Sequence, residues 1–110
     1  VVGWLMCISG SQKGRALSVF FGRNFAGRAK SMDIRFTDDD YISRDNHFSI
    51  VYDPKSNKFS LVPGGGETHI NNMVVNNVQQ LYEDDVIEVG QTKYLFVPYC
   101  KEGRTWNEEN

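Results

Sequence analysis

The chain has 110 residues, of which 40% are hydrophobic and 24% charged, so it suits one globular domain and leaves no room for a second core. Its apolar runs are shorter than the roughly 18–20 residues of a membrane span, and no signal peptide is visible, so we expect a cytoplasmic domain without direct membrane contact. Six basic residues and one acid lie between Lys13 and Arg35, whereas the remainder is acidic. This distribution argues against nucleic-acid binding and permits a discrete anion site.

Short strand signals recur along the chain, and no helical stripe persists beyond two turns. Val, Ile, Phe and Tyr are plentiful, which favours strands. The pattern predicts a β-sandwich over residues 1–100, followed by a polar tail, 101–110, that frays unless Trp106 folds back. The expected strands lie at 4–8, 16–21, 33–36, 47–52, 59–62, 73–75, 86–89 and 94–97, with turns at 22–24 and 53–58. A further strand that contains Phe25 is expected to lead to Gly27.

The two cysteines, Cys7 and Cys100, lie in strand-like segments near opposite ends of the chain. They could pair if the terminal strands lie side by side, whereas the lack of a secretory signal favours free thiols. Both alternatives stay open at the level of sequence.

Catalytic and metal-binding patterns are weak, and we expect neither an enzyme nor a cofactor. Ser43 and His47 lie in one short segment without nucleophile-elbow glycines, which disfavours a nucleophilic serine. The acidic run 38–40 lacks the spacing and glycine of a calcium loop, so we interpret it as a solvated loop. The glycine run 64–66 lacks the Lys-Ser/Thr of a nucleotide loop and predicts a flexible or sharply bent connection.

The residues that carry most information are Arg28 and Ser43. Each lies in a loop beside an expected strand, and loops at one end of a sandwich converge. A guanidinium fork together with a hydroxyl is a natural receptor for a phosphate oxyanion. Each residue alone is a weak signal, since an exposed arginine in a turn is usually only solvated.

The order and spacing of these residues resemble the signature of the forkhead-associated (FHA) domain. The matching residues are Gly27-Arg28, then after four residues Asp33-Ile34 and Phe36, and then Ile42-Ser43-Arg44 with His47 nearby. The resemblance continues through Ile70-Asn71-Asn72, Asp84-Asp85-Val86-Ile87, Val89-Gly90 and Leu95-Phe96, and covers about residues 3 to 99.

The resemblance implies an all-β, FHA-like (SMAD/FHA type) β-sandwich of about eleven strands that binds phosphothreonine peptides through loops at one end. Carried over by position, Arg28 would bond the phosphate and Ser43 would add its hydroxyl. Arg44 would contact the peptide or the surroundings of the phosphate. Gly27 and His47 would be structural, with His47 buried and bracing the binding loops.

The sequence departs from the family pattern in three places. His47 comes one residue late, so either the loop is longer or Asn46 takes its position; the alternation of Phe48, Ile50 and Tyr52 favours the longer loop. The asparagine that clasps the peptide backbone is missing from the stretch 65–68, where Thr68 or Asn72 could substitute. Asn71 matches the asparagine that holds the following turn, and Asn72 replaces the turn glycine, where its tolerance of a left-handed backbone fits.

Two functional hypotheses follow. The first is a monomeric phosphothreonine-reading module of a larger signalling or secretion-related protein. The alternative is an FHA-like domain that binds its partner without phosphate, favoured by the missing clasp and by the aromatic residues Tyr41, Tyr82, Tyr99 and Trp106.

Overall fold

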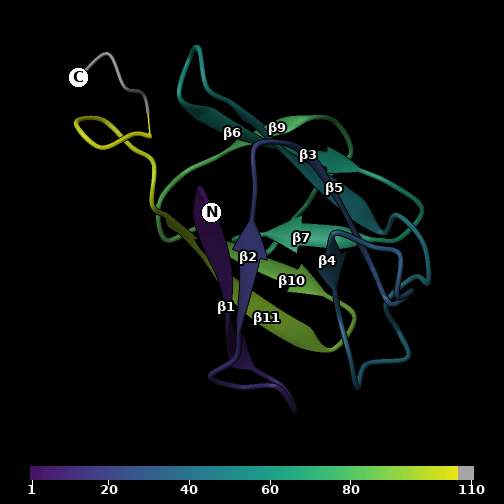
Figure 1. Ribbon diagram of the computed structural model, residues 1–110. Helices are drawn as coiled ribbons and strands as arrows, with labels where there is room; N and C mark the ends of the chain where they lie inside the picture. The colour runs from purple at the N-terminus through teal and green to yellow at the C-terminus, as the bar shows by residue number, and fades with distance from the viewer. Residues whose placement is uncertain (107–110) are drawn as a thin grey trace.

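The computed structural model describes residues 1–106, which form two β-sheets packed face to face (Figure 1). One sheet has the strand order β2-β1-β11-β10-β7-β8 and the other has the order β4-β3-β5-β6-β9. The strands are β1 (Gly3–Ser9), β2 (Ala16–Val19), β3 (Gly22–Gly27), β4 (Ile34–Arg35), β5 (Phe48–Asp53), β6 (Lys58–Pro63), β7 (Thr68–Ile70), β8 (Met73–Val74), β9 (Gln79–Leu81), β10 (Val86–Val89) and β11 (Thr92–Pro98). The predicted all-β sandwich of eleven strands is confirmed.

The core lies between the sheets and is filled by alternate residues of each strand. On β5, Phe48, Ile50 and Tyr52 all point inward, as their alternation predicts. Phe36 packs against both Phe48 and Tyr94, with ring centroids 5.9 and 5.2 Å apart. Aromatic contacts of this kind tie the short β4 segment to the opposite sheet.

The turn between β2 and β3 comes earlier than expected. The predicted turn at 22–24 is wrong because Asn24 belongs to β3 and is buried, with 2% of its surface exposed. Its side-chain amide accepts a hydrogen bond from the Phe20 amide and donates to the carbonyls of Phe20 and Ile50, at 2.9, 2.9 and 3.1 Å.

The strand β9 was also not expected, because Gln79-Gln80-Leu81 has weak strand propensity and forms through pairing with β6.

The described part of the C-terminal tail folds back onto the domain. The Trp106 ring stacks on Tyr99 with centroids 4.6 Å apart, and its indole N–H donates to the Val1 carbonyl at 2.6 Å. The guanidinium of Arg104 also lies 4.6 Å from the Tyr99 ring centroid. Residues 101–106 therefore pack rather than fray, residues 107–110 lie outside the described residues, and the domain boundary at residue 100 stays a prediction.

Cys7 and Cys100 are free thiols, and both are buried. β1 and β11 are neighbours, but Cys7 stands opposite Tyr94 near one end of the pair. The Cys100 amide bonds to the Val2 carbonyl at the other end. Side-by-side terminal strands therefore do not bring the two sulfurs together.

Within residues 1–106 the structure contains no helix long and apolar enough to span a membrane.

Candidate functional site

Gly27 and Arg28 lie where β3 ends, and the loop that carries Ser43 packs directly against them. The Arg28 amide donates to the Ser43 carbonyl at 3.1 Å, and the Ala29 amide donates to the Arg44 carbonyl at 2.8 Å. A Cβ atom on Gly27 would stand only 2.6 Å from the Arg44 carbonyl oxygen. The glycine thus allows the close approach that brings the Arg28 and Ser43 segments together.

The Arg28 side chain is half-buried and held along one edge. Its Nε atom donates to the Ile42 carbonyl at 2.6 Å, so the guanidinium is fixed beside the segment that leads into Ser43. Within residues 1–106 it makes no ion pair, and its terminal amino groups have no hydrogen-bond partner. A fixed guanidinium with free N–H groups is preorganised to receive an oxyanion.

His47 connects the Ser43 loop with the loop before β7. Its ring is buried, with 2% exposed, and its Nδ1 accepts a hydrogen bond from the Ser43 amide at 2.9 Å. Its Nε2 lies 2.8 Å from the Glu67 carbonyl, which makes Nε2 the protonated nitrogen of a neutral ring. Asn46 is exposed and takes a left-handed conformation, with φ of 43°, so the longer loop is absorbed at Asn46 and His47 takes the buried position.

The glycine run 64–66 forms a bent connection packed on this histidine. The amides of Gly64 and Gly65 donate to the carbonyls of His47 and Asn46, at 3.1 and 2.9 Å. A Cβ atom on Gly66 would stand 2.2 Å from the His47 ring. Of the two expected alternatives, the sharp bend is the one observed.

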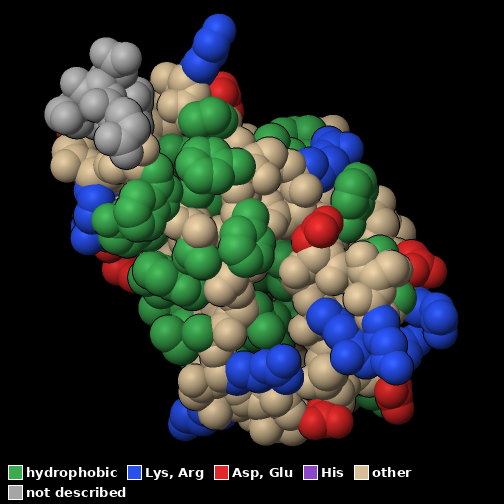
Figure 2. Space-filling model, in the orientation of Figure 1, with side chains coloured by type: hydrophobic (Ala, Val, Ile, Leu, Met, Phe, Trp, Pro, Cys, Tyr) green, Lys and Arg blue, Asp and Glu red, His purple; other side chains and the backbone are tan. Residues whose placement is uncertain are grey.

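Four cationic side chains surround a hollow of about 500 Å³ next to Arg28. Its lining consists of Arg28, Ala29, Lys30, Ser31, Arg35 and Arg44, none of which is acidic. Lysine and arginine side chains gather in this way on the molecular face beside β4 (Figure 2). Arg44 lies 4.0 Å from Asp45, but both side chains are largely exposed, so the pair is weak.

A smaller hollow of about 220 Å³ is lined by Ser43 itself. It is lined by Tyr41, Ser43, His47, Gly66, Glu67, His69, Glu88 and Gly90. His69 Nε2 stands 3.4 Å from a Glu67 carboxylate oxygen. Ser43 therefore lines the hollow that holds two carboxylates, Glu67 and Glu88, whereas the adjacent Arg44 lines the cationic hollow.

The three residues offered as peptide contacts around β7 occupy different surroundings. Thr68 is buried, with 1% exposed, and its hydroxyl has no hydrogen-bond partner among the described residues, which argues against contact with a surface peptide. Asn71 binds β10, since its side chain donates to Asp85 and accepts from the Val86 amide, each at 2.9 Å. Asn71 and Asn72 form the β7–β8 turn with φ of 51° and 70°, as the tolerance of asparagine for this conformation predicts. The structure does not join these residues to the Arg28 and Ser43 segments, whereas Glu67 is joined to them through His47.

The acidic run 38–40 is not a solvated loop throughout, so its interpretation from the sequence is wrong at Asp39. Asp39 is buried, and its carboxylate accepts hydrogen bonds from the Tyr41 amide at 3.0 Å, the Gln91 amide at 2.7 Å and the Thr92 hydroxyl at 2.6 Å. No group of three or more His, Cys, Asp or Glu side chains gathers for a metal ion within residues 1–106. Asp39 thus connects the loop to the β10–β11 turn by hydrogen bonds. No local sequence pattern predicts this role.

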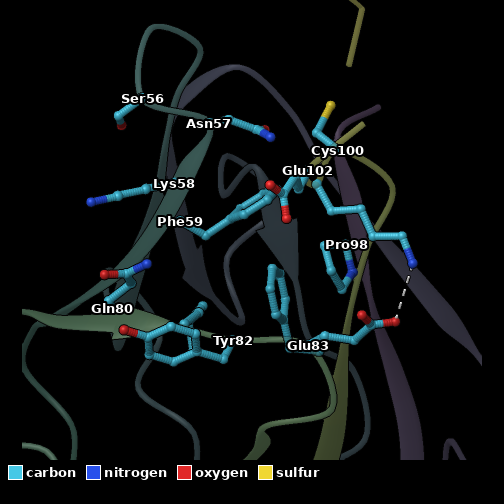
Figure 3. A pocket seen from close by; sticks show the side chains of 13 residues that line it. Ser56, Asn57, Lys58, Phe59, Gln80, Tyr82, Glu83, Pro98, Cys100 and Glu102 are labelled. Atoms are coloured by element: carbon cyan, nitrogen blue, oxygen red, sulfur yellow. Dashed lines mark ion pairs between the residues drawn. The ribbon is translucent and has the colours of Figure 1, made fainter. Parts of the chain in front are cut away.

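A larger hollow of about 560 Å³ opens at the opposite end of β5, beside Phe59, Tyr82 and Cys100 (Figure 3). Its floor is apolar, and its two cations are lysines: Lys101 lies 3.6 Å from Glu83, and Lys58 has an ammonium group rather than a guanidinium fork. Volume alone would favour this hollow, but an anion would find no unpaired guanidinium there. We therefore assign the candidate site to the Arg28 and Ser43 segments.

Comparison with known families matches residues 19–90 to the FHA domain, which is more than half of the chain. The chain belongs to the FHA domain family. No curated protein matches the sequence as a relative.

Solved structures agree in fold. A structure described as "Structural and functional analysis of phosphothreonine-dependent FHA domain interactions" is 26% identical, covers 92% of this chain and 100% of its own, and has a TM-score of 0.77. The FhaA FHA domain complexed with the intracellular domain of Rv3910 is 28% identical, covers 86% and 98%, and has a TM-score of 0.73. The N-terminal FHA domain of S. cerevisiae Rad53p, solved with a phosphothreonine peptide, is 21% identical, covers 93% and 95%, and has a TM-score of 0.72.

Proposed function

We propose that this domain binds phosphothreonine-containing protein segments, with the phosphate received by Arg28 and Ser43. The observation that carries the proposal is the Arg28 guanidinium, which is fixed by the Ile42 carbonyl and has no acidic partner in the described part of the chain. FHA domains are interaction modules, and a relative 26% identical is described as phosphothreonine-dependent. We therefore assign binding rather than catalysis.

The phosphate would be held by charge and by hydrogen bonds from preset donors. A phosphothreonine carries a charge of about −1.5 to −2 near pH 7 and offers three strong acceptor oxygens. The terminal amino groups of Arg28 would donate to two of them, and the Ser43 hydroxyl would donate to a third. Both donors belong to segments already joined by the Arg28 amide and the Ser43 carbonyl, so little ordering is needed on binding.

The peptide backbone would be held less firmly than the phosphate. Position 66, in the loop that packs beside Ser43, is a glycine without a side chain to bond the peptide, and Thr68 is buried. Arg44 is exposed and free to reach a neighbouring residue of the peptide. We expect affinity to depend chiefly on phosphate and on charged residues near it, because backbone and flanking contacts otherwise supply selectivity.

A titration with a degenerate phosphothreonine peptide library and its unphosphorylated twin tests the proposal. Binding of the phosphorylated set alone, lost in Arg28→Ala, is the expected result. Equal binding of both sets would contradict it and favour the alternative, a phosphate-independent interaction domain. That alternative has its own support in exposed aromatic side chains, since Tyr41 is 72%, Tyr82 61% and Trp106 50% exposed.

The wider context is part of the proposal. We place the domain as a monomeric module of a larger cytoplasmic protein in signalling or secretion, with no nucleic-acid partner. The two free cysteines are consistent with a reducing compartment. Gel filtration of the isolated domain tests the monomeric state directly.

A further inference from the structure

The hollow beside Arg28 holds more positive charge than one phosphate requires. Arg28, Lys30, Arg35 and Arg44 all line it, and no acid does. One phosphothreonine supplies at most about two negative charges. Even if Asp45 offsets Arg44 fully at 4.0 Å, at least one positive charge remains unmatched when a single phosphate is bound.

The surplus lies on one side of the site. Lys30 and Arg35 are exposed, and neither makes an ion pair among the described residues. The hollow that Ser43 lines contains Glu67 and Glu88, which would repel a second anion. An additional negative group of the ligand would therefore settle beside Lys30 and Arg35.

The positions of these two side chains are set by the same loop as Arg28. Arg35 is the last residue of β4, which pairs in parallel with β3, and its Nε donates to the Arg28 carbonyl at 3.3 Å. Lys30 follows Ala29, whose amide is bonded to the Arg44 carbonyl. The backbone of the whole cluster is thus ordered before a ligand arrives, while the charged ends stay solvated.

We propose that Lys30 and Arg35 form a second anion subsite, so that the preferred ligand is a phosphothreonine segment carrying another phosphorylated residue nearby. The inference rests on the proposed function, because the first phosphate at Arg28 anchors the ligand. A second phosphate fits the subsite better than Asp or Glu, because it carries more charge and offers one more acceptor oxygen. The subsite makes the domain a reader of clustered phosphorylation.

The test compares three peptides that share one sequence: phosphothreonine alone, phosphothreonine with a phosphoserine at a scanned offset, and phosphothreonine with Glu at that offset. At the best offset we expect the doubly phosphorylated peptide to bind about tenfold more tightly than the singly phosphorylated one, with Glu between them. In Lys30→Gln/Arg35→Gln the gain, taken as the ratio of the two affinities in that variant, falls to about threefold or less, and the affinity for the singly phosphorylated peptide falls by less than that for the doubly phosphorylated one. Thermal unfolding of each variant checks that the fold is retained.

Arg23→Gln is the matched control. Arg23 is exposed on β3, the strand that leads to Arg28, but lies five residues before Arg28, or roughly 17 Å away, beyond the screening length at physiological salt. It should leave the gain intact. A second phosphate that adds no affinity at any offset, or a gain that survives Lys30→Gln/Arg35→Gln, would overturn the subsite but leave the phosphothreonine site standing.

Two other outcomes bear on the source of the anion. If the singly phosphorylated peptide binds no better than its unphosphorylated twin, the proposed function fails and the subsite fails with it. Vesicles containing a bisphosphorylated inositol lipid could also supply two phosphates. Binding to them as tightly as to the doubly phosphorylated peptide, with the same dependence on Lys30 and Arg35, would overturn the assignment to a peptide.

Discussion

The ring of His47 occupies the space that a side chain at position 66 would need. A Cβ atom on Gly66 would stand 2.2 Å from both Cε1 and Nδ1 of His47. Gly66 does not have a positive φ, so glycine is required there for space and not for backbone conformation. The sequence departs from the family pattern in the longer loop before His47 and in the missing asparagine of the 65–68 stretch. These two segments contact each other where Gly66 lies against the His47 ring.

Gly66→Ala should destabilise the domain by about 2–3 kcal/mol, because a well-packed ring must move to admit the methyl group. Urea unfolding measures the loss. In a His47→Ala background the same substitution should cost less than about 1 kcal/mol, since the space is then open. Equal costs in the two backgrounds would show that His47 and Gly66 do not compete for space.

Arg28→Ala should reduce phosphopeptide affinity by about 2–4 kcal/mol, the cost typical of removing one partner of a close charge pair. The fold should lose little, because only one hydrogen bond, to the Ile42 carbonyl, disappears. Arg28→Lys keeps the charge but not the planar fork, so we expect an intermediate affinity. Isothermal titration together with thermal unfolding checks both effects. A large stability loss without a binding defect would assign Arg28 to the framework.

Asp39→Asn should destabilise the domain by about 1–3 kcal/mol. The three groups that donate to the Asp39 carboxylate cannot all be satisfied by an amide, which turns one acceptor into a donor. Asp40→Asn removes the same charge from an exposed neighbour and should change stability by less than about 0.5 kcal/mol. Chemical denaturation of the two variants side by side measures the difference; equal effects would contradict a special role for Asp39.

Stability should fall in alkaline solution because two core phenols resist ionisation. Burial raises the pKa of Tyr52 from 10.0 to about 12, helped by its hydrogen bond with Cys100, and burial also raises the pKa of Tyr94. The unfolded chain releases these protons near pH 10, so the stabilisation is complete below that pH and is lost as pH rises from about 10 through the folded values.

Melting temperatures measured between pH 8 and 11 check this expectation. Tyr52→Phe should flatten part of the decline, because it removes one of the two titrating groups. A profile that is flat in the parent protein, or unchanged in Tyr52→Phe, would contradict the assignment.

The sequence predicted the fold well where strands carry their own signal. β5 and β11 have regular alternation, and the Asp53–Lys58 segment has turn chemistry, so their places were readable. β9 was not, since Gln79-Gln80-Leu81 becomes a strand only through its neighbour β6. The turn at Phe20–Gly22 was missed because a long-range bond from Asn24 to the Ile50 carbonyl helps to fix it.

The candidate site was predictable only as far as order and spacing allow. The closeness of Arg28 to Ser43 could be expected from the family resemblance. Lys30 and Arg35 belong to no sequence motif, and they were assigned to the site only because they line the same hollow as Arg28. The acidic run concealed a buried carboxylate at Asp39, because burial depends on the β10–β11 turn about fifty residues away. The sequence shows that Thr68 is polar but does not predict that it is buried.

The most direct test is an amide NMR map of the domain titrated with a phosphothreonine peptide and with its unphosphorylated twin. We expect the phosphorylated peptide alone to shift the amides of Arg28, Ser43, Arg44 and Glu67, the segments joined through His47. Shifts that are the same for both peptides, or that lie instead around the Phe59 and Tyr82 hollow, would contradict a phosphate-reading site at Arg28 and Ser43.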